Sequence, residues 1–167
     1  KVLCGAVGFD SGILTINGNT YQKHAPALSK SKILAVSPQS NCITEELTVF
    51  QNLFIHHNIW FQNAETFFDK NIPEFLQEMG QIIRPFLYEK AKKLSPSLLN
   101  LLQIIRTVLT DREILIFDEP IIYFSDYEKD LFLSMISYLR QNGKTIIVIS
   151  HMADQFVNTA DYITILR

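Results

Sequence analysis

Polar residues able to bind a metal ion or to move a proton follow three apolar runs of the sequence. Asp118 and Glu119 come directly after one run. His151 lies two residues beyond a second run, and Gln39 lies three residues beyond a third. Each run has the composition of a buried strand, and parallel sheets bind their ligands at the carboxyl ends of the strands. We therefore expect these four side chains to lie at one edge of a sheet.

The chemistry of these residues is that of phosphate hydrolysis. Four apolar residues followed by Asp-Glu form the Walker B pattern, in which Asp118 helps to hold Mg²⁺ and Glu119 polarises the attacking water. His151 is expected near Glu119, where its ring contacts a terminal phosphate. The amide oxygen of Gln39 completes the Mg²⁺ shell. The alternatives are a solvated turn for the two acids, a structural histidine, and a surface glutamine.

The last third of the chain determines the fold class. Apolar runs at residues 113–117, 144–149 and 162–166 alternate with helical patterns at 126–141 and 152–159. Strands that alternate with helices and are apolar throughout indicate an α/β fold, with a mostly parallel sheet and helices on both faces.

The first two thirds supply further elements. Residues 1–7 have helical spacing without a start signal, residues 13–21 predict a β-hairpin around an Asn-Gly turn, and residues 33–37 predict a buried strand. A buried helix is expected over residues 96–109, with Ser95 as its N-cap.

Residues 47–93 are mostly helical in pattern, with breaks at Pro73 and Pro85. This region is rich in aromatic side chains, which we interpret as core packing. They are Phe50, Phe54, Trp60, Phe61, Phe67, Phe68 and Phe75.

Composition narrows the function classes. The 167 residues, 47% hydrophobic and 19% charged, indicate one globular domain, and a net charge of -2 gives no basic field for nucleic acid. The most apolar stretch, Leu98–Leu109, is too short and too polar to span a bilayer. Cys4 and Cys42 make no disulfide framework, which favours a reducing, cytoplasmic setting. The mean hydropathy of +0.11 suggests apolar surface that is buried against a partner.

Taken together, the motifs resemble those of the ATP-binding subunit of an ABC transporter, in family order along nearly the whole chain. Residues 10–18 resemble the segment after the phosphate-binding helix, and 47–53 the stretch after the Q-loop. The other matches are Ser37-Pro38-Gln39 with the Q-loop, Leu94-Ser95 with the start of the LSGGQ signature, Ile114–Pro120 with Walker B, Ser125-Asp126 with the D-loop, and Ile149-Ser150-His151 with the H-loop.

The resemblance implies a P-loop NTPase-like fold with a helical subdomain at about 47–110, and ATP and Mg²⁺ as ligands. It also implies partners: a membrane permease, a second ATP-binding domain and a substrate-binding protein, but no nucleic acid, at the cytoplasmic face of the membrane. The roles it implies are catalytic for Glu119 and His151, nucleotide contact for Gln39, Ser95 and Asp126, and Mg²⁺ binding for Asp118 and Gln39. Residues 160–167 and 47–55 resemble segments of importers of ribose or galactose.

The sequence also departs from the family pattern. It contains no G-x-x-x-x-G-K-[ST] loop, which the family would place just before Lys1, so we expect a fragment that binds ATP poorly by itself. Pro96, Ser97 and Leu98 replace the Gly-Gly-Gln of the signature, and Pro96 has no N–H to donate. Before the D-loop, where the family usually has small residues, residues 121–124 are Ile-Ile-Tyr-Phe.

Two hypotheses therefore remain open. The first is a working ATPase subunit, and the second is a degenerate, non-hydrolysing half with a structural or regulatory role. Glu119 and His151 favour the first, because a structural half has no chemical need of both. An ABC ATPase acting on nucleic acid has little support from the net charge of -2.

Overall fold

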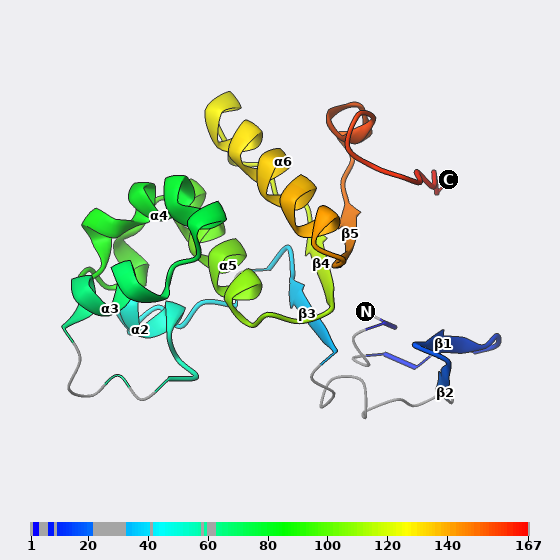
Figure 1. Ribbon diagram of the computed structural model, residues 1–167, viewed down its shortest axis with the longest axis horizontal. Helices are drawn as coiled ribbons and strands as arrows, with labels where there is room; N and C mark the ends of the chain where they lie inside the picture. Colours follow the sequence, from blue (N-terminus) through cyan, green and yellow to red (C-terminus); the bar gives the residue numbers. More distant parts are fainter. Residues whose placement is uncertain are drawn as a thin grey trace.

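A three-stranded parallel sheet organises the protein (Figure 1). The computed structural model describes residues 2–3, 7–8, 10–21, 33–40, 42–57, 59 and 63–166. The strands are β3 (Leu34–Ser37), β4 (Ile114–Asp118) and β5 (Thr145–Ile149), in the order β3-β4-β5. Ser37 lies opposite Phe117, and Asp118 lies opposite Ile149. The carboxyl ends of all three strands therefore meet at one edge, as the sequence predicts.

Two long helices pack on this sheet, and local signals define both. Helix α5 (Pro96–Leu109) begins at the N-cap Ser95, and helix α6 (Asp126–Gln141) begins at the N-cap Ser125. In α6 the cap is a full capping box, because the Glu128 side chain accepts a hydrogen bond from the Ser125 backbone N–H. Both helices have the predicted bounds.

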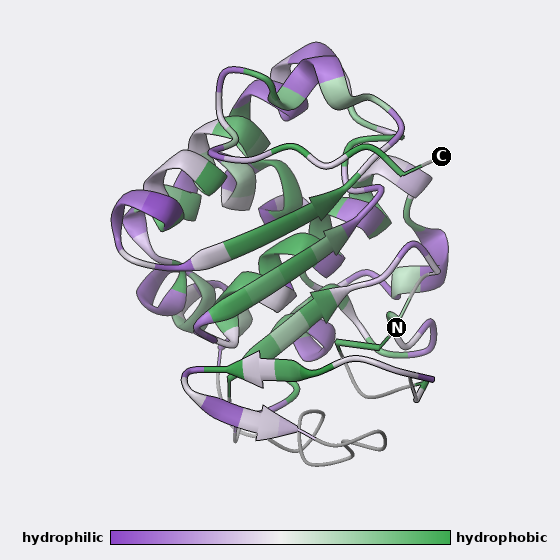
Figure 2. Cartoon of the chain, turned by 90° about the vertical axis from the view of Figure 1, so that its right-hand side faces the viewer, coloured by the Kyte–Doolittle hydropathy of each residue, from purple (hydrophilic) through white to green (hydrophobic). Residues whose placement is uncertain are grey.

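The helices lie on one face of the sheet. Figure 2 looks onto the opposite face, with α5 and α6 behind the strands. Alternate strand residues belong to the core that the helices complete: Ala35, Leu115, Phe117, Ile146 and Val148. The prediction of helices on both faces is thus met on one face, and the described residues place no helix against the other.

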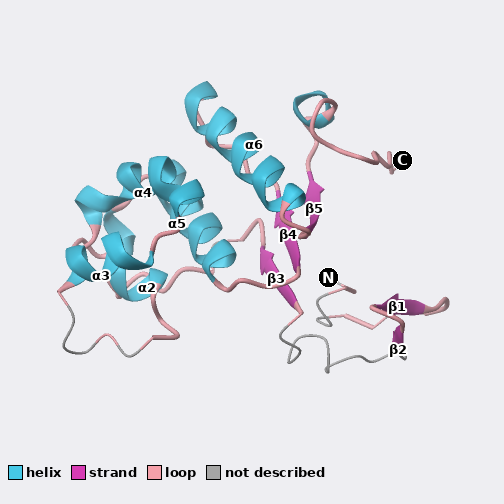
Figure 3. Cartoon of the chain, viewed as in Figure 1, coloured by secondary structure: helices cyan, strands magenta, loops and turns pink. Residues whose placement is uncertain are grey.

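Short helices fill the region between β3 and α5 (Figure 3). They are α2 (Val49–Leu53), α3 (Ala64–Asn71), η1 (Glu74–Leu76), α4 (Gln77–Ile83), η2 (Arg84–Phe86) and η3 (Ala91–Lys93). Pro73 precedes η1 and Pro85 lies within η2, at the predicted breaks. Phe50, Phe54 and Phe68 are buried, which confirms core packing for them, whereas Trp60 and Phe61 lie outside the described residues.

The predicted hairpin is present as β1 (Leu14–Ile16) and β2 (Asn19–Tyr21), paired antiparallel. Asn17 and Gly18 have φ angles of 51° and 76°, which is the tight turn that an Asn-Gly pair favours. The Asn17 side-chain amide donates to Glu113, just before β4. Most of the helical pattern predicted at residues 1–7 lies outside the described residues.

The strand predicted at residues 162–166 is wrong. This segment has no strand structure, and Tyr162, Ile165 and Leu166 are exposed. An apolar run becomes a strand only when a neighbour pairs with its backbone, and within the described part of the chain the sheet ends at β5. The helix predicted at 152–159 is shorter, a 3₁₀ turn η4 (Ala153–Phe156). Within the described part of the chain, no helix has the length and apolar character needed to cross a bilayer.

Candidate functional site

Glu119 occupies a turn with unusual backbone geometry at the end of β4. Its φ angle of 51° is in the left-handed region, which a residue with a Cβ adopts at a cost. Its N–H donates to the Ile149 carbonyl at 2.8 Å, so the pairing of β4 with β5 continues one residue beyond the strand. The turn holds Glu119 beside the residues that follow β5.

The Glu119 carboxylate pairs with His151. Oε1 accepts the His151 backbone N–H at 3.0 Å, and Oε2 lies 2.9 Å from His151 Nδ1. Because a carboxylate only accepts, Nδ1 carries a proton in this pair, and Nε2 is the ring nitrogen left for a ligand. The Glu119 side chain is 15% exposed and that of His151 is 63% exposed. The carboxylate is thus oriented through both of its oxygens, and its contact with His151 is the one that the sequence predicts.

Asp118 and Gln39 lie at the same edge of the sheet. Asp118 ends β4 and is half-buried, and Gln39 follows β3 two residues after Ser37 and is exposed. Among the described residues, no three His, Cys, Asp or Glu side chains gather to form a complete metal site. A carboxylate and an amide oxygen do suit Mg²⁺ that arrives with a phosphate substrate, because such an ion keeps few protein ligands.

Ser95 and Asp126 lie at the N-termini of two different helices. The Ser95 hydroxyl accepts the Leu98 N–H at 3.3 Å and caps α5. The Asp126 carboxylate pairs with Lys129 at 3.0 Å and is 99% exposed. The hydrogen bonds of the described residues connect neither side chain to Glu119 or His151. The structure therefore brings Glu119 and His151 into contact and leaves Ser95 and Asp126 at separate helix ends.

A hydrogen bond that the sequence analysis missed joins these two helix ends. Ser97 Oγ donates to Glu128 Oε1 at 2.7 Å, and Glu128 Oε2 accepts from the N–H and the hydroxyl of Ser125. Burial raises the pKa of the Glu128 carboxyl, but the bonds from Ser97 and Ser125 outweigh burial and leave the pKa below its ordinary value. The Ser-x-x-Glu spacing is a signal for the cap. No local signal points to Ser97.

Helix α5 also contacts the turn that carries Glu119. The side-chain amide of Asn100 donates to the carbonyl of Pro120, the residue after Glu119. This bond joins positions 20 residues apart, so periodicity along the chain does not reveal it. It ties the first turns of α5 to the end of β4.

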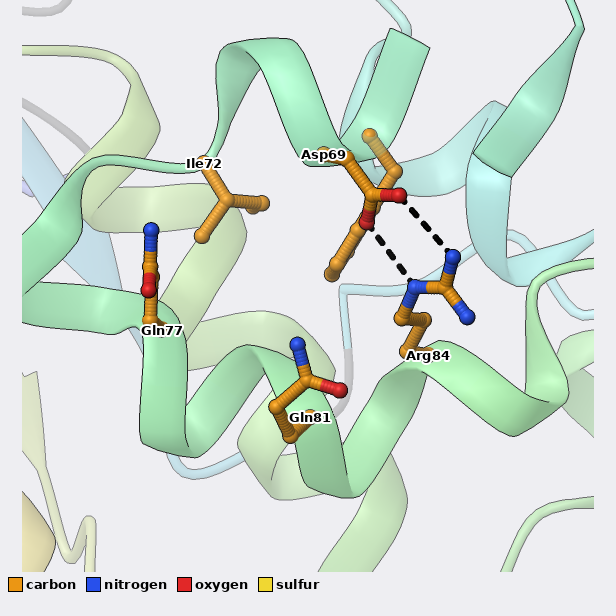
Figure 4. A pocket seen from close by; sticks show the side chains of 6 residues that line it. Asp69, Ile72, Gln77, Gln81 and Arg84 are labelled. Carbon is orange, nitrogen blue, oxygen red and sulfur yellow. Dashed lines mark hydrogen bonds and ion pairs between the residues drawn. The ribbon is translucent and has the colours of Figure 1, made fainter. Parts of the chain in front are cut away.

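A separate hollow of about 270 Å³ lies among α3, α4 and η2 (Figure 4). Arg84 makes two hydrogen bonds to Asp69 there, at 2.8 and 2.9 Å, which lower the pKa of Asp69 and raise that of Arg84. No predicted site residue is among its lining side chains: Phe68, Asp69, Ile72, Gln77, Gln81 and Arg84.

Comparison with known proteins gives a consistent result. The family model described as ABC transporter matches residues 1–122. The ribose import ATP-binding protein of Halalkalibacterium halodurans is 30% identical over 173 residues, and the D-allose import ATP-binding protein of Escherichia coli is 26% identical over 171 residues. Each match covers 100% of this chain but 34% of the relative, so the chain spans about a third of the length of these curated relatives.

Solved structures agree on the fold. A dimeric ATP-binding cassette in a post-hydrolysis state, bound to ADP and Pi, aligns with a TM-score of 0.72 at 17% sequence identity. The alignment covers 92% of this chain and 68% of that one. The parallel sheet and its helices therefore have the α/β arrangement of an ATP-binding cassette.

Proposed function

Because the chain belongs to the ABC transporter family, we propose that it is part of an ATPase subunit that powers the import of a sugar. The names of the two relatives, which import ribose and allose, support a sugar as cargo. The observation that carries the proposal is the oriented Glu119 carboxylate in contact with His151. This pair favours hydrolysis over the non-hydrolysing alternative, since a structural half has no need of a fixed acceptor for a proton.

Glu119 acts on the water that attacks the terminal phosphate of ATP. Transfer of a phosphoryl group depends mainly on positioning and on charge, so an acceptor held at a fixed orientation is what the step requires. The His151 N–H and ring hold the carboxylate, which accepts the water's hydrogen bond and then its proton. The Nε2 atom of His151 is available to a phosphate oxygen, to which it donates when the ring is protonated.

Asp118 and Gln39 would hold Mg²⁺ at the edge of the sheet, beside Glu119. The ion, when bound, neutralises charge on the phosphates. The sequence has no G-x-x-x-x-G-K-[ST] loop, so the groups that we assign to this chain are the carboxylates, the amide and the imidazole that follow the strands.

Ser95 and Asp126 act toward a second ATP-binding domain. The first turn of α5 presents the Ser95 hydroxyl, while Pro96 removes one N–H that a phosphate would use. We assign Ser95 to the phosphate of the facing domain and Asp126 to the contact between the domains. The dimeric state of the solved cassette supports a paired arrangement.

The remaining partners follow from the transport role. We assign residues 47–110 to a helical subdomain that meets a membrane permease at the cytoplasmic face, and we include a substrate-binding protein that delivers the sugar. The described helices of this region, and the exposed aromatic residue Tyr88 in the turn between η2 and η3, support a surface of this kind. Nucleic acid is not among the partners, given the net charge of -2.

Steady-state ATP hydrolysis by the complete ATPase subunit of which this chain is part tests this proposal. Glu119→Gln keeps the shape of the side chain and removes the proton acceptor, so kcat is expected to fall by at least about 100-fold, with little change in KM for ATP. The matched control is Glu113→Gln, which changes a carboxylate just before the other end of β4 and is expected to leave kcat unchanged. Equal turnover by Glu119→Gln and the wild type would remove Glu119 from the mechanism.

A further inference from the structure

The segment that presents Gln39 is anchored by a buried side chain on helix α5. Gln103 is 4% exposed, and its amide reaches across more than 60 residues of sequence. Oε1 accepts the Cys42 N–H at 2.9 Å, and Nε2 donates to the Pro38 carbonyl at 2.6 Å. One side chain therefore holds the backbone on both sides of Gln39.

Every hydrogen-bonding group of the Gln103 side chain, which we call the anchor, has a partner. Nε2 of Gln103 also donates to the hydroxyl of Ser37 at 3.1 Å, and Ser37 is 2% exposed at the end of β3. Both hydrogens of the amide group and its oxygen thus have partners. A buried amide is costly unless its bonds are made, and a complete set of bonds in a dry environment fixes one geometry.

A second bond from the same helix reaches the same segment. Arg106 Nη2 donates to the Cys42 carbonyl at 3.0 Å, one turn beyond Gln103 on α5. Partial burial lowers the pKa of the Arg106 guanidinium, which still carries its charge at neutral pH. Cys42 is therefore held through both its N–H and its carbonyl.

We infer that Gln103 is a positioning residue for Gln39, which it holds at the edge of the sheet by clamping Pro38 and Cys42 to helix α5. The effect on the Mg²⁺ dependence of ATP hydrolysis rests on the proposed function, whereas the anchoring of Pro38 and Cys42 does not. Because α5 begins at Ser95, the clamp also joins the helix end that faces the second domain to the residue assigned to Mg²⁺. Any shift of α5 relative to the sheet is transmitted to the Gln39 segment.

The test compares Gln103→Met with Thr107→Val in the protein. Methionine matches the length of glutamine and makes none of these bonds. Thr107 is the control, because it is buried one turn further along α5 and, among the described residues, its hydroxyl bonds only to the Gln103 carbonyl within the helix. Hydrogen–deuterium exchange, resolved to the Cys42 amide and measured without nucleotide, is expected to become at least about tenfold faster in Gln103→Met and to stay unchanged in Thr107→Val.

The second readout, made in the complete ATPase subunit of which this chain is part, is the Mg²⁺ concentration that gives half-maximal ATP hydrolysis. It is expected to rise about three- to tenfold in Gln103→Met, with a smaller change in kcat at saturating Mg²⁺, and to stay constant in Thr107→Val. Unchanged exchange at Cys42 would overturn the anchor. Faster exchange with an unchanged Mg²⁺ response would overturn the positioning of Gln39.

A variant that does not fold and a protein that does not hydrolyse ATP can each be distinguished from failure of the inference. If Gln103→Met does not yield folded protein, Arg106→Met removes the bond to the Cys42 carbonyl and leaves the bonds of Gln103 in place, and the same two changes are expected at smaller size. Absence of hydrolysis by the complete ATPase subunit of which this chain is part would contradict the proposed function, whereas the exchange measurement, made without nucleotide, decides the anchor independently.

Discussion

Polar side chains at the ends of β3 and β4 depend on bonds from residues far away in the sequence. Glu119 takes a left-handed backbone conformation and is held by the N–H of His151, 32 residues further on. Ser97 and Gln103 make their bonds from one helix to two other segments. At the residue scale, Glu119 and the segment that carries Gln39 are therefore each held by a partner that belongs to another element.

Ser97 and Glu128 are expected to be coupled in their contributions to the free energy of unfolding. A hydrogen bond to a charged group contributes about 1.5–3 kcal/mol when it is shielded from water, so a double-mutant cycle with Ser97→Ala and Glu128→Gln should give a coupling free energy of about 1 kcal/mol or more. Urea unfolding measures it. The control cycle uses the exposed pair Glu89 and Lys93, for which about 0.3–0.5 kcal/mol is expected. Equal coupling in the two cycles would contradict the role of Ser97.

At the element scale, short helices persist because they are held by buried contacts. Helix α2 has five residues, too few for stability alone, yet its side chain Asn52 is fully buried and donates to the carbonyls of Thr44, Leu47 and Thr48. The ring of Phe54 packs on the rings of its aromatic neighbours at centroid distances of 5.0 to 6.4 Å. These contacts supply the stability that the length of the helix does not.

Truncation of this aromatic cluster is expected to be costly. Phe54→Ala removes a ring that is 1% exposed and should lower the free energy of unfolding by about 3–5 kcal/mol, measured by urea titration. Tyr88→Ala removes a ring of similar size that is 62% exposed, and its effect should stay within about 0.5 kcal/mol. Similar losses from the two changes would mean that the cluster is not a core.

The exposed carboxylate of Glu46 predicts how the thermal stability of the protein depends on pH. Hydrogen bonds from Lys92 and Lys90, with their charges, lower the pKa of Glu46 from 4.5 to about 2. A folded-state pKa below the unfolded value stabilises the fold above pH 4.5, and the contribution is lost as the pH falls toward 2. The Tm of the wild type should exceed that of Glu46→Gln at pH 6, and the difference should shrink steadily from pH 4.5 downward.

The control for this prediction is Glu45→Gln. Its side chain makes no hydrogen bond or ion pair to the described residues, so the difference in Tm from the wild type should stay small at every pH. Because Glu46 is exposed, solvent limits the size of its effect, and the direction of the trend is the test. A difference that grew on acidification would contradict the assignment.

At the scale of the whole molecule, helix α5 joins the segments that carry the candidate site. Asn100 donates to the Pro120 carbonyl, Ser97 to Glu128, and Gln103 to the Pro38 carbonyl. The ends of β3 and β4 and the start of α6 are thus attached to one rigid helix. A change in the position of α5 therefore acts on Gln39, Glu119 and Asp126 together.

Elements whose signals are local can be predicted from the amino-acid sequence. Serine caps and apolar periodicity give the bounds of α5 and α6, the Asn-Gly pair gives the hairpin, and apolar runs followed by polar residues give β3, β4 and β5 with their shared edge. In each of these cases the deciding contacts lie within a few residues of one another or repeat with the period of the element.

The partners of the site residues, by contrast, are seen only in the folded chain. The bonds of Gln103 to Pro38 and Cys42, and of Ser97 to Glu128, join segments more than 30 residues apart, and no periodicity encodes them. The same reason explains the failure at residues 162–166, where an apolar run forms no ladder with a strand of the described sheet. The hydrophobic pattern indicates which residues are buried, but the backbone hydrogen bonds depend on which strands lie side by side in the assembled sheet.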